Sequence, residues 1–408
     1  MSSDQPQNLR RVLSLPLVVL YGLGITIGAG IYVLVGETAG RAGMLAPLSF
    51  LVAAVVMVFP ALCFAELSGR FPFASGAAQY TEESFGSRWL GLGVGLLVIS
   101  AGLVAASTIS LGSVQYLSSL VDIPPPALLI ALVGLMGLIC IWGIKESVVF
   151  AGVMTLIEIG GLLAVIAGGF VFDNDLLTHA DRLLPTEWTA ATLTGVLQAS
   201  LLAFFAFIGF EGIANIAEET VNPRRTLPMA VILTLGISSA IYALVVSIAV
   251  LTIGPDSLAA QKAPLAYLFK QTTGLPASAI TLIAVMATLN GVIVQMIMVS
   301  RLAYGLSSRG LLPPVLARVH PVRRTPVVSI GLTGILIMVL SLLFPVVELA
   351  EWTSRIILLV FTVVCMALLR LKIRGLPGSS GGFEVSAWVP AAGTLLCAGL
   401  LAADLIWG

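Results

Sequence analysis

Eleven long apolar stretches divide this chain of 408 residues, and they constrain its fold more than any other feature. A helix needs about 20 mostly apolar residues to cross the roughly 30 Å of hydrocarbon in a bilayer. Only 10% of the residues are charged, so each stretch can reach about that length. Numbered in chain order as spans one to eleven, they are 13–36, 43–68, 89–119, 127–144, 147–171, 192–217, 228–253, 276–306, 326–345, 347–371 and 387–406.

The continuity of these stretches predicts helices. Strands of a membrane barrel show short segments of alternating hydrophobicity, which this sequence lacks. Every backbone polar group within lipid must be satisfied internally, and a helix achieves this by itself. We therefore expect an all-α integral membrane protein of about 11 transmembrane helices, with the lipid bilayer as its surroundings.

The basic residues are distributed unevenly over the connections between the spans. With the N-terminus in the cytoplasm, 15 of the 20 Lys and Arg residues fall on the cytoplasmic side and 4 on the opposite side. Cytoplasmic loops of membrane proteins carry such an excess. The asymmetry predicts a multi-pass protein of the cell (inner) membrane with a cytoplasmic N-terminus and an external C-terminus. The formal net charge is zero, so these loops do not indicate nucleic-acid binding.

Spans one and six carry glycines where a helix would be weakened. Each glycine costs up to about 1 kcal/mol relative to alanine in a helix interior. In span six, Gly209 and Gly212 flank Glu211. The glycines of span one are Gly22, Gly24, Gly28 and Gly30. Close packing against a neighbouring helix is one explanation, and an unwound segment is the other.

The positions of the two interruptions, five spans apart, favour unwound segments. Corresponding breaks in two five-helix halves indicate an inverted repeat with a binding site near the bilayer midplane. An unwound helix exposes N–H groups at the start of its second half and C=O groups at the end of its first half. Such a site suits a small zwitterion or anion.

The repeat sets the predicted domain organisation. A cytoplasmic N-terminal segment, 1–12, precedes a ten-helix core, 13–371. A cytoplasmic loop and the eleventh helix follow the core. The two repeats of the core and these C-terminal elements are expected at 13–171, 192–371, 372–386 and 387–408.

Five sequence motifs occur in order along residues 15 to 372. They are Ile27-Gly-Ala-Gly-Ile-Tyr32, Phe64-Ala-Glu-Leu-Ser-Gly-Arg-Phe-Pro72, Gly143-Ile-Lys-Glu-Ser147, Phe205-Ala-Phe-Ile-Gly-Phe-Glu211 with Ala217-Glu-Glu-Thr-Val-Asn-Pro223, and Ser300-Arg-Leu-Ala-Tyr304 with Arg309-Gly-Leu-Leu-Pro313. With these motifs the chain resembles the amino acid/polyamine/organocation permeases, particularly the bacterial relatives of cationic amino acid transporters. The resemblance implies a ten-helix inverted-repeat core and alternating access by rocking of one helix bundle against another.

The resemblance also implies a substrate site at the two broken spans. Amides of the Gly28-Ala29-Gly30 motif would receive the substrate carboxylate, and carbonyls of span six would meet its ammonium group. Phe205 matches an aromatic residue that closes over the ligand. The expected substrate-binding residues are Thr26, Gly28, Ala29, Gly30, Ile31, Phe205, Ala206 and Ile208.

The charged residues within the spans include Glu158, Glu211 and Arg355, and a charge is costly there and therefore suggests a function. Glu158 lies inside span five, where relatives often place a lysine, and burial there favours the neutral acid. We hypothesise that Glu158 exchanges the coupling proton or binds another coupling ion; a permanently protonated structural acid is the alternative. Glu211 is expected to cap the second half of span six or to contact a basic substrate. Arg355 is expected to pair with Glu351 near the outer interface, or else to contact Glu158 or substrate.

Taken together, these features predict a secondary active transporter for an amino acid or related amine, with proton-coupled symport as the first interpretation. An amino acid or polyamine exchanger and a transporter-like substrate sensor stay open, as does a basic substrate facing Glu158 and Glu211. No catalytic triad, phosphate-binding loop or metal-ligand spacing occurs in the sequence, so we expect neither an enzyme nor a metal or cofactor. The four cysteines lie inside apolar stretches and are expected to pack rather than to form disulfides.

Overall fold

The computed structural model describes residues 13–71, 76–142, 148–172, 176–184, 189–320, 325–376 and 383–407. Two predicted features lie outside the described residues, namely the N-terminal segment 1–12 and the motif at 143–147. Within the predicted cytoplasmic loop 372–386, the structure describes residues 372–376 and 383–386.

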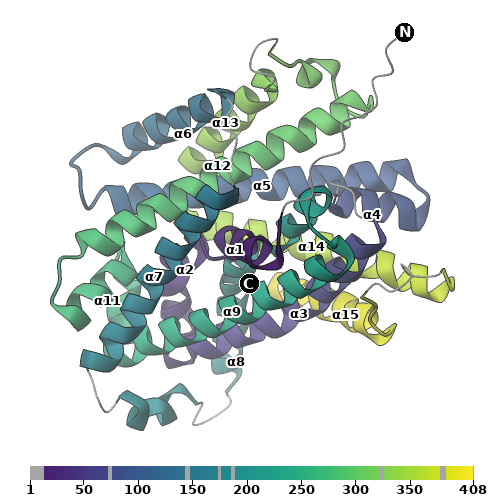
Figure 1. Cartoon of the computed structure of the whole chain (residues 1–408). Coiled ribbons are helices and arrows are strands. Elements are labelled where there is room, and N and C mark those ends of the chain that lie inside the picture. The colour runs from purple at the N-terminus through teal and green to yellow at the C-terminus, as the bar shows by residue number, and fades with distance from the viewer. Residues whose placement is uncertain are drawn as a thin grey trace.

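Helices make up nearly all of the described chain, which confirms the all-α prediction (Figure 1). An isolated bridge between Leu13 and Thr220 is the one β-type pairing among the described residues. Every predicted span falls on helical structure. The α-helices are α1 (Leu15–Thr26), α2 (Ala29–Ala42), α3 (Ala46–Arg70), α4 (Gly76–Phe85), α5 (Arg88–Leu117), α6 (Pro125–Trp142), α7 (Val148–Phe172), α8 (Ala190–Phe207), α9 (Pro223–Thr252), α10 (Pro255–Ala259), α11 (Pro264–Thr273), α12 (Ser278–Ser308), α13 (Val327–Leu343), α14 (Val346–Ile373) and α15 (Trp388–Trp407). The 3-10 segments are η1 (Gly43–Leu45), η2 (Leu176–Leu183), η3 (Phe210–Glu219) and η4 (Pro314–Ala317).

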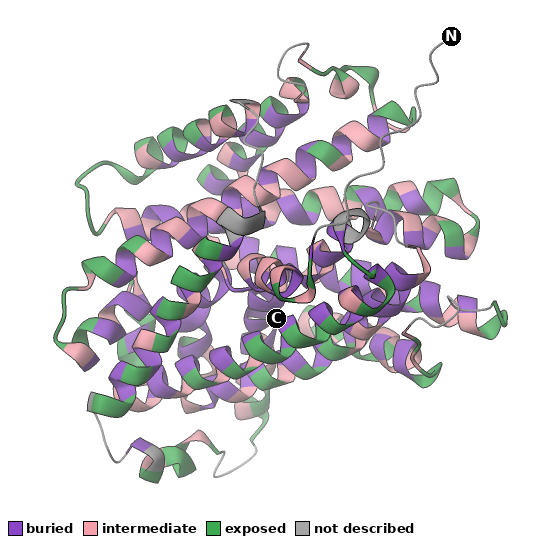
Figure 2. Ribbon diagram, viewed as in Figure 1, coloured by how far each residue is buried: buried purple, intermediate pink, exposed green. Residues whose placement is uncertain are grey.

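Many of the helices are long and apolar enough to cross a bilayer. Among the described residues, 8 helical segments are long and apolar enough, and shorter apolar helices occupy Leu15–Thr26, Pro125–Ile141 and Val327–Leu343. The side chains of Leu138 and Leu395 are among the exposed large hydrophobic ones. Buried residues gather where helices meet (Figure 2). Exposed leucines on outward faces suit a lipid environment.

Both predicted interruptions are present as breaks between helical segments. Span one consists of α1 and α2, separated at Ile27 and Gly28. Span six consists of α8 and the 3-10 segment η3, separated at Ile208 and Gly209. The unwound interpretation of the glycine-rich segments is therefore correct, although some of these glycines also allow close packing, as described below.

Two clusters of buried apolar side chains hold the helices together. The larger cluster includes residues of α1, α3, α8 and α9, and the smaller one includes residues of α5, α6, α12 and α13. Figure 1 shows α6, α12 and α13 on one side of α1 and α3, α8 and α9 on the other. Ile208 and Leu289 pack against both clusters, so the break of span six lies where the clusters meet.

Several helices connect the spans without being predicted. α4 follows α3, and α10 and α11 lie between α9 and α12. These helices are short, and their patterns of polar and apolar residues are too brief to be separated from loops by sequence alone. The four cysteines are free and buried. Three of them, Cys63 of α3, Cys365 of α14 and Cys397 of α15, lie close enough to interact with one another.

Candidate functional site

The break of span one leaves the start of α2 without a side-chain cap. α1 ends at Thr26, and the N-cap of α2 is Gly28, which has no side chain. The first N–H groups of an α-helix have no partner within the helix, and they carry the positive end of the helix dipole. The start of α2 can therefore receive an anionic group.

The break of span six is stabilised differently. Gly209 adopts a φ of 137°, a conformation that residues with a Cβ rarely adopt. The Glu211 carboxylate accepts a hydrogen bond from the Gly209 N–H, with Oε2 2.9 Å from the nitrogen. Glu211 therefore caps the break of span six, because its carboxylate accepts a hydrogen bond from a backbone N–H that the break leaves free.

The two breaks contact each other closely because their glycines lack side chains. A Cβ at Gly30 would overlap the backbone and side chain of Ala206. A Cβ at Gly209 would lie 2.8 Å from the carbonyl oxygen of Ile25. Neither position has room for a methyl group. A larger residue at Gly30 would push α2 away from α8, and one at Gly209 would push the break of span six away from α1.

A tyrosine from α9 joins the ends of the two first half-helices. The Tyr242 hydroxyl lies 2.8 Å from the carbonyl oxygen of Thr26 and 3.0 Å from that of Ala206. A hydroxyl has one proton to donate, so the two carbonyls share it. Tyr242 is fully buried, and the terminal carbonyls of both breaks thus have a donor in a region closed to water.

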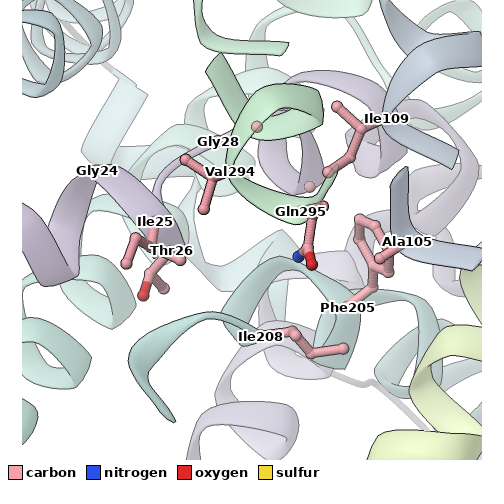
Figure 3. A pocket seen from close by; sticks show the side chains of 12 residues that line it. Gly24, Ile25, Thr26, Gly28, Ala105, Ile109, Phe205, Ile208, Val294 and Gln295 are labelled. Atoms are coloured by element: carbon pink, nitrogen blue, oxygen red, sulfur yellow. The ribbon is translucent and has the colours of Figure 1, made fainter. Parts of the chain in front are cut away.

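A small cavity lies at this junction (Figure 3). Its volume is about 40 Å³, whereas a single buried water needs about 10 to 15 Å³. α5 and α12 form the wall opposite the two breaks. The lining residues are Gly24, Ile25, Thr26, Gly28, Gly30, Ala105, Ile109, Phe205, Ile208, Gly291, Val294 and Gln295.

Most of the predicted substrate-binding residues line this cavity. They are Thr26, Gly28, Gly30, Phe205 and Ile208. Ile31 and Ala206 are buried just outside it, and the carbonyl of Ala206 accepts from Tyr242. A carbonyl oxygen has two lone pairs, so this contact leaves a second acceptor position. Ala29 contributes the first residue of α2.

Two polar atoms of the cavity wall have no hydrogen-bond partner. Thr26 is 3% exposed, and its hydroxyl is unpartnered. The Oε1 atom of Gln295 is likewise buried and unpartnered. A buried polar atom without a partner is costly, so both atoms are suited to bind a polar ligand.

Glu158 lies near the break of span one but does not line the cavity. It is 2% exposed on α7, and its Oε2 atom has no hydrogen-bond partner. Its backbone carbonyl accepts from the Tyr32 hydroxyl at 3.1 Å. One turn earlier on α7, Thr155 contacts Gly24 of α1. The carboxyl group is therefore enclosed between α7 and the residues around the break.

Arg355 is part of an ion-pair network away from the cavity. Its side chain lies 3.3 Å from Glu351 and 2.5 Å from Asp404 of α15. Glu351 also pairs with Arg41 at the end of α2, at 2.5 Å. The network links α2, α14 and α15 on the predicted outer side, and Arg355 contacts neither Glu158 nor the cavity among the interactions described.

The sequence interpretation missed several residues of this site. Gln295, Val294 and Gly291 come from span eight, and Ala105 and Ile109 come from span three. A lone glutamine in the middle of span eight was the available signal, because polar residues within spans often face the protein interior. Asp404 gave the same kind of signal in span eleven. Tyr242 gave none, because a tyrosine within an apolar helix is compatible with ordinary packing.

Among the described residues, no three His, Cys, Asp or Glu side chains come close enough together to hold a metal ion. The cavity wall instead combines helix-end amides, apolar side chains and two uncharged polar groups. Such an arrangement can bind a small organic molecule but provides no nucleophile and base for covalent chemistry.

Known proteins similar in sequence to this chain cover nearly its whole length. Residues 13–406 match the family model described as amino acid permease. A mitochondrial cationic amino acid transporter of Arabidopsis thaliana is 30% identical over 90% of this chain, and the chain spans 63% of that protein's length. A branched-chain amino acid permease of Bacillus subtilis is 28% identical, with 90% of this chain and 82% of the permease covered. A methylthioribose transporter of the same organism is 26% identical, with 91% and 83% covered.

Proposed function

The chain belongs to the amino acid permease family, and on this premise we propose that it is a secondary transporter that carries amino acids across a membrane by alternating access. The observation that carries the proposal is the meeting of two broken helices at one enclosed cavity. Broken helices expose backbone N–H and C=O groups within the membrane, which can bind the carboxylate and the ammonium group of an amino acid. Intact membrane helices use these groups in their own hydrogen bonds.

The asymmetry of the breaks orients the substrate. The start of α2 has no side-chain cap, so it supports a carboxylate there. The break of span six is capped by its own Glu211 and presents carbonyls at the end of α8, so it supports the ammonium group. In this proposal Thr26, Gly28, Ala29, Gly30 and Ile31 surround the carboxylate end. Phe205, Ala206 and Ile208 surround the amino end.

The proposed transport cycle moves the two apolar clusters relative to each other. Residues 13–171 and 192–371 form the two inverted repeats, and the cavity lies where the clusters meet. Rocking of the larger cluster against the smaller one would open the cavity to one side of the membrane at a time. In this proposal the protein lies in a cell membrane, with its N-terminus and the connection after α12 on the cytoplasmic side; the excess of basic residues in these segments supports this orientation.

Glu158 is the proposed coupling residue. It is enclosed beside the break of span one, and its Oε2 atom lacks a partner. A carboxyl group in this position is neutral when protonated and costly when charged. Movement of α1 during transport would change its exposure and therefore its tendency to hold a proton, which would couple proton movement to substrate movement.

Uptake by the purified chain in proteoliposomes tests the transport proposal. We expect a radiolabelled amino acid to accumulate when an inward proton gradient is imposed, and to leak out when the gradient is dissipated. Uptake only into vesicles preloaded with substrate would identify an exchanger, and saturable binding without flux would identify a sensor. Absence of both binding and uptake across all proteinogenic amino acids would reject the proposal.

Replacement of Glu158 by Gln tests the coupling role separately. Glutamine keeps the size of the side chain but cannot exchange a proton. We expect Glu158→Gln to retain exchange of substrate across the membrane while losing accumulation driven by the proton gradient. The matched control is Glu37→Gln, because Glu37 is exposed on α2. Unchanged dependence of uptake on pH in Glu158→Gln would assign Glu158 a structural role.

A further inference from the structure

This inference rests on the proposed function. If the two breaks bind the carboxylate and the ammonium group of an amino acid, the cavity wall formed by α5 and α12 faces its side chain. The two breaks supply the groups for the carboxylate and the ammonium. Ala105, Ile109 and Val294 on the facing wall are apolar. Gln295 supplies the single polar side chain of this wall, halfway along α12.

The side chain of Gln295 lines the cavity. Figure 3 shows the amide among the lining side chains, between Thr26 and Phe205. Gln295 Oε1 lies next to Gly102 of α5, 3.4 Å from the position that a Cβ at residue 102 would take. Oε1 is buried without a partner. An amide carries both donors and an acceptor, so it can bind a hydroxyl or another amide from either side.

The charge of the cavity wall separates substrate classes. None of the twelve lining residues is acidic or basic. Glu158 lies outside the cavity, and the Glu211 carboxylate already accepts from Gly209. A cationic or anionic substrate side chain would therefore be buried without an opposite charge, which is strongly unfavourable.

We propose that Gln295 is a specificity-determining residue and that this site takes small uncharged amino acids whose side chains hydrogen-bond to its amide. L-serine, L-threonine and L-asparagine have such side chains. L-lysine and L-arginine lack a counter-charge in the site, and L-alanine fits without using the amide.

Competition for uptake into proteoliposomes tests this inference on the wild-type chain. We expect L-serine or L-asparagine to compete at least about tenfold better than L-lysine, from the loss of one buried hydrogen bond and the lack of a counter-charge. Preference for L-lysine or L-arginine would overturn the inference while leaving amino acid transport intact. Absence of transport of every amino acid would reject the proposed function and this inference with it.

Two substitutions separate recognition from general damage. Gln295→Leu removes the amide at similar volume, and we expect about a tenfold loss of affinity for L-asparagine with little change for L-alanine. An equal loss for both substrates would show a structural role and contradict the inference. Gln295→Glu supplies a carboxylate, and we expect it to gain uptake of L-lysine.

The control for the charge gained is Gln271→Glu, because Gln271 is exposed on α11. Lysine uptake gained equally by Gln271→Glu would indicate surface attraction and overturn the assignment to Gln295. Size-exclusion chromatography in detergent establishes that each variant is folded. If both Gln295 variants fail to fold, the competition series on the wild-type chain still decides the inference.

Discussion

The break of span one and the break of span six differ in how their exposed amides are satisfied. At span one, the N-cap of α2 is Gly28, and no side chain bonds to the start of the helix. At span six, Glu211 accepts from the N–H of Gly209. One break is therefore open to an external anion, and the other is closed by an anion of its own chain. Under the proposed function, this difference would hold a zwitterionic substrate in a single orientation.

Separating the two breaks should have the largest effect. Gly30→Val would place a side chain against the backbone of Ala206, and neither helix can move aside without disrupting its own packing. We expect no measurable uptake in proteoliposomes. The control is Gly236→Val on α9, because a Cβ at Gly236 meets nothing within 4 Å. Normal uptake by Gly30→Val would show that the close contact between the breaks is not needed for transport.

Giving the first break a cap of its own should abolish the difference between the breaks. Gly28→Asp places a carboxylate at the N-cap of α2, where it competes with the substrate carboxylate. Because a cap contributes about 0.5 to 2 kcal/mol, we expect thermal stability to be kept and the KM for uptake to rise by about 2- to 30-fold.

Gly28→Ala is the control for this substitution. Its Cβ meets only the Ile25 carbonyl oxygen, at 3.9 Å, and the alanine side chain offers no acceptor to the helix. Uptake by Gly28→Ala should therefore stay close to that of the unaltered chain. An unchanged KM in Gly28→Asp would argue against binding of a carboxylate at α2.

Removing the hydroxyl that joins the breaks tests their mutual positioning. Tyr242→Phe leaves the carbonyls of Thr26 and Ala206 without this donor. Loss of a partner for a buried polar group costs about 1 to 3 kcal/mol. We expect a lower melting temperature and several-fold slower uptake. Tyr116→Phe removes a similar bond to the carbonyl of Tyr32 and should lower the melting temperature without changing uptake. Equal effects of both variants on uptake would deny Tyr242 a special role.

Weakening the cap of the second break should have the smallest effect. Glu211→Gln removes the charge but keeps an oxygen that can accept from Gly209. Hydrogen bonds to charged groups are roughly twice as strong as those between neutral groups, so we expect a loss of about 1 kcal/mol in stability and less than a tenfold change in uptake. Thermal unfolding and uptake measured together check this, with exposed Glu83→Gln as the control. Complete loss of uptake would show that the charge of Glu211 contacts the substrate directly.

Hydrophobic patterning was sufficient to predict the positions of the spans. Each apolar segment within lipid must satisfy its own backbone hydrogen bonds by forming a helix, so its structure depends on its own sequence. The glycines of spans one and six were sufficient to predict the breaks, because a helix interior rarely tolerates such clusters. The same local signals could not predict α10 and α11, whose short helices depend on contacts with α2 and α7.

The sequence could not predict side-chain contacts between residues of spans that are far apart in the chain. Arg355 was expected beside Glu351, four residues earlier on one helix face, and that pair depends only on helix geometry. Its shorter contact with Asp404 depends on how α15 packs against α14. The same holds for Gln295, which lines the cavity because of how α12 packs against α5.

The sequence by itself determined that this chain is an all-α membrane protein of the amino acid permease family with two broken spans, because hydrophobic length and glycine content act locally along the chain. The tertiary structure alone decided which break is open and which is capped, that Tyr242 joins them, and that Gln295 faces them across an uncharged cavity. Those features depend on side chains from helices far apart in sequence, whose positions follow from the packing of the whole molecule.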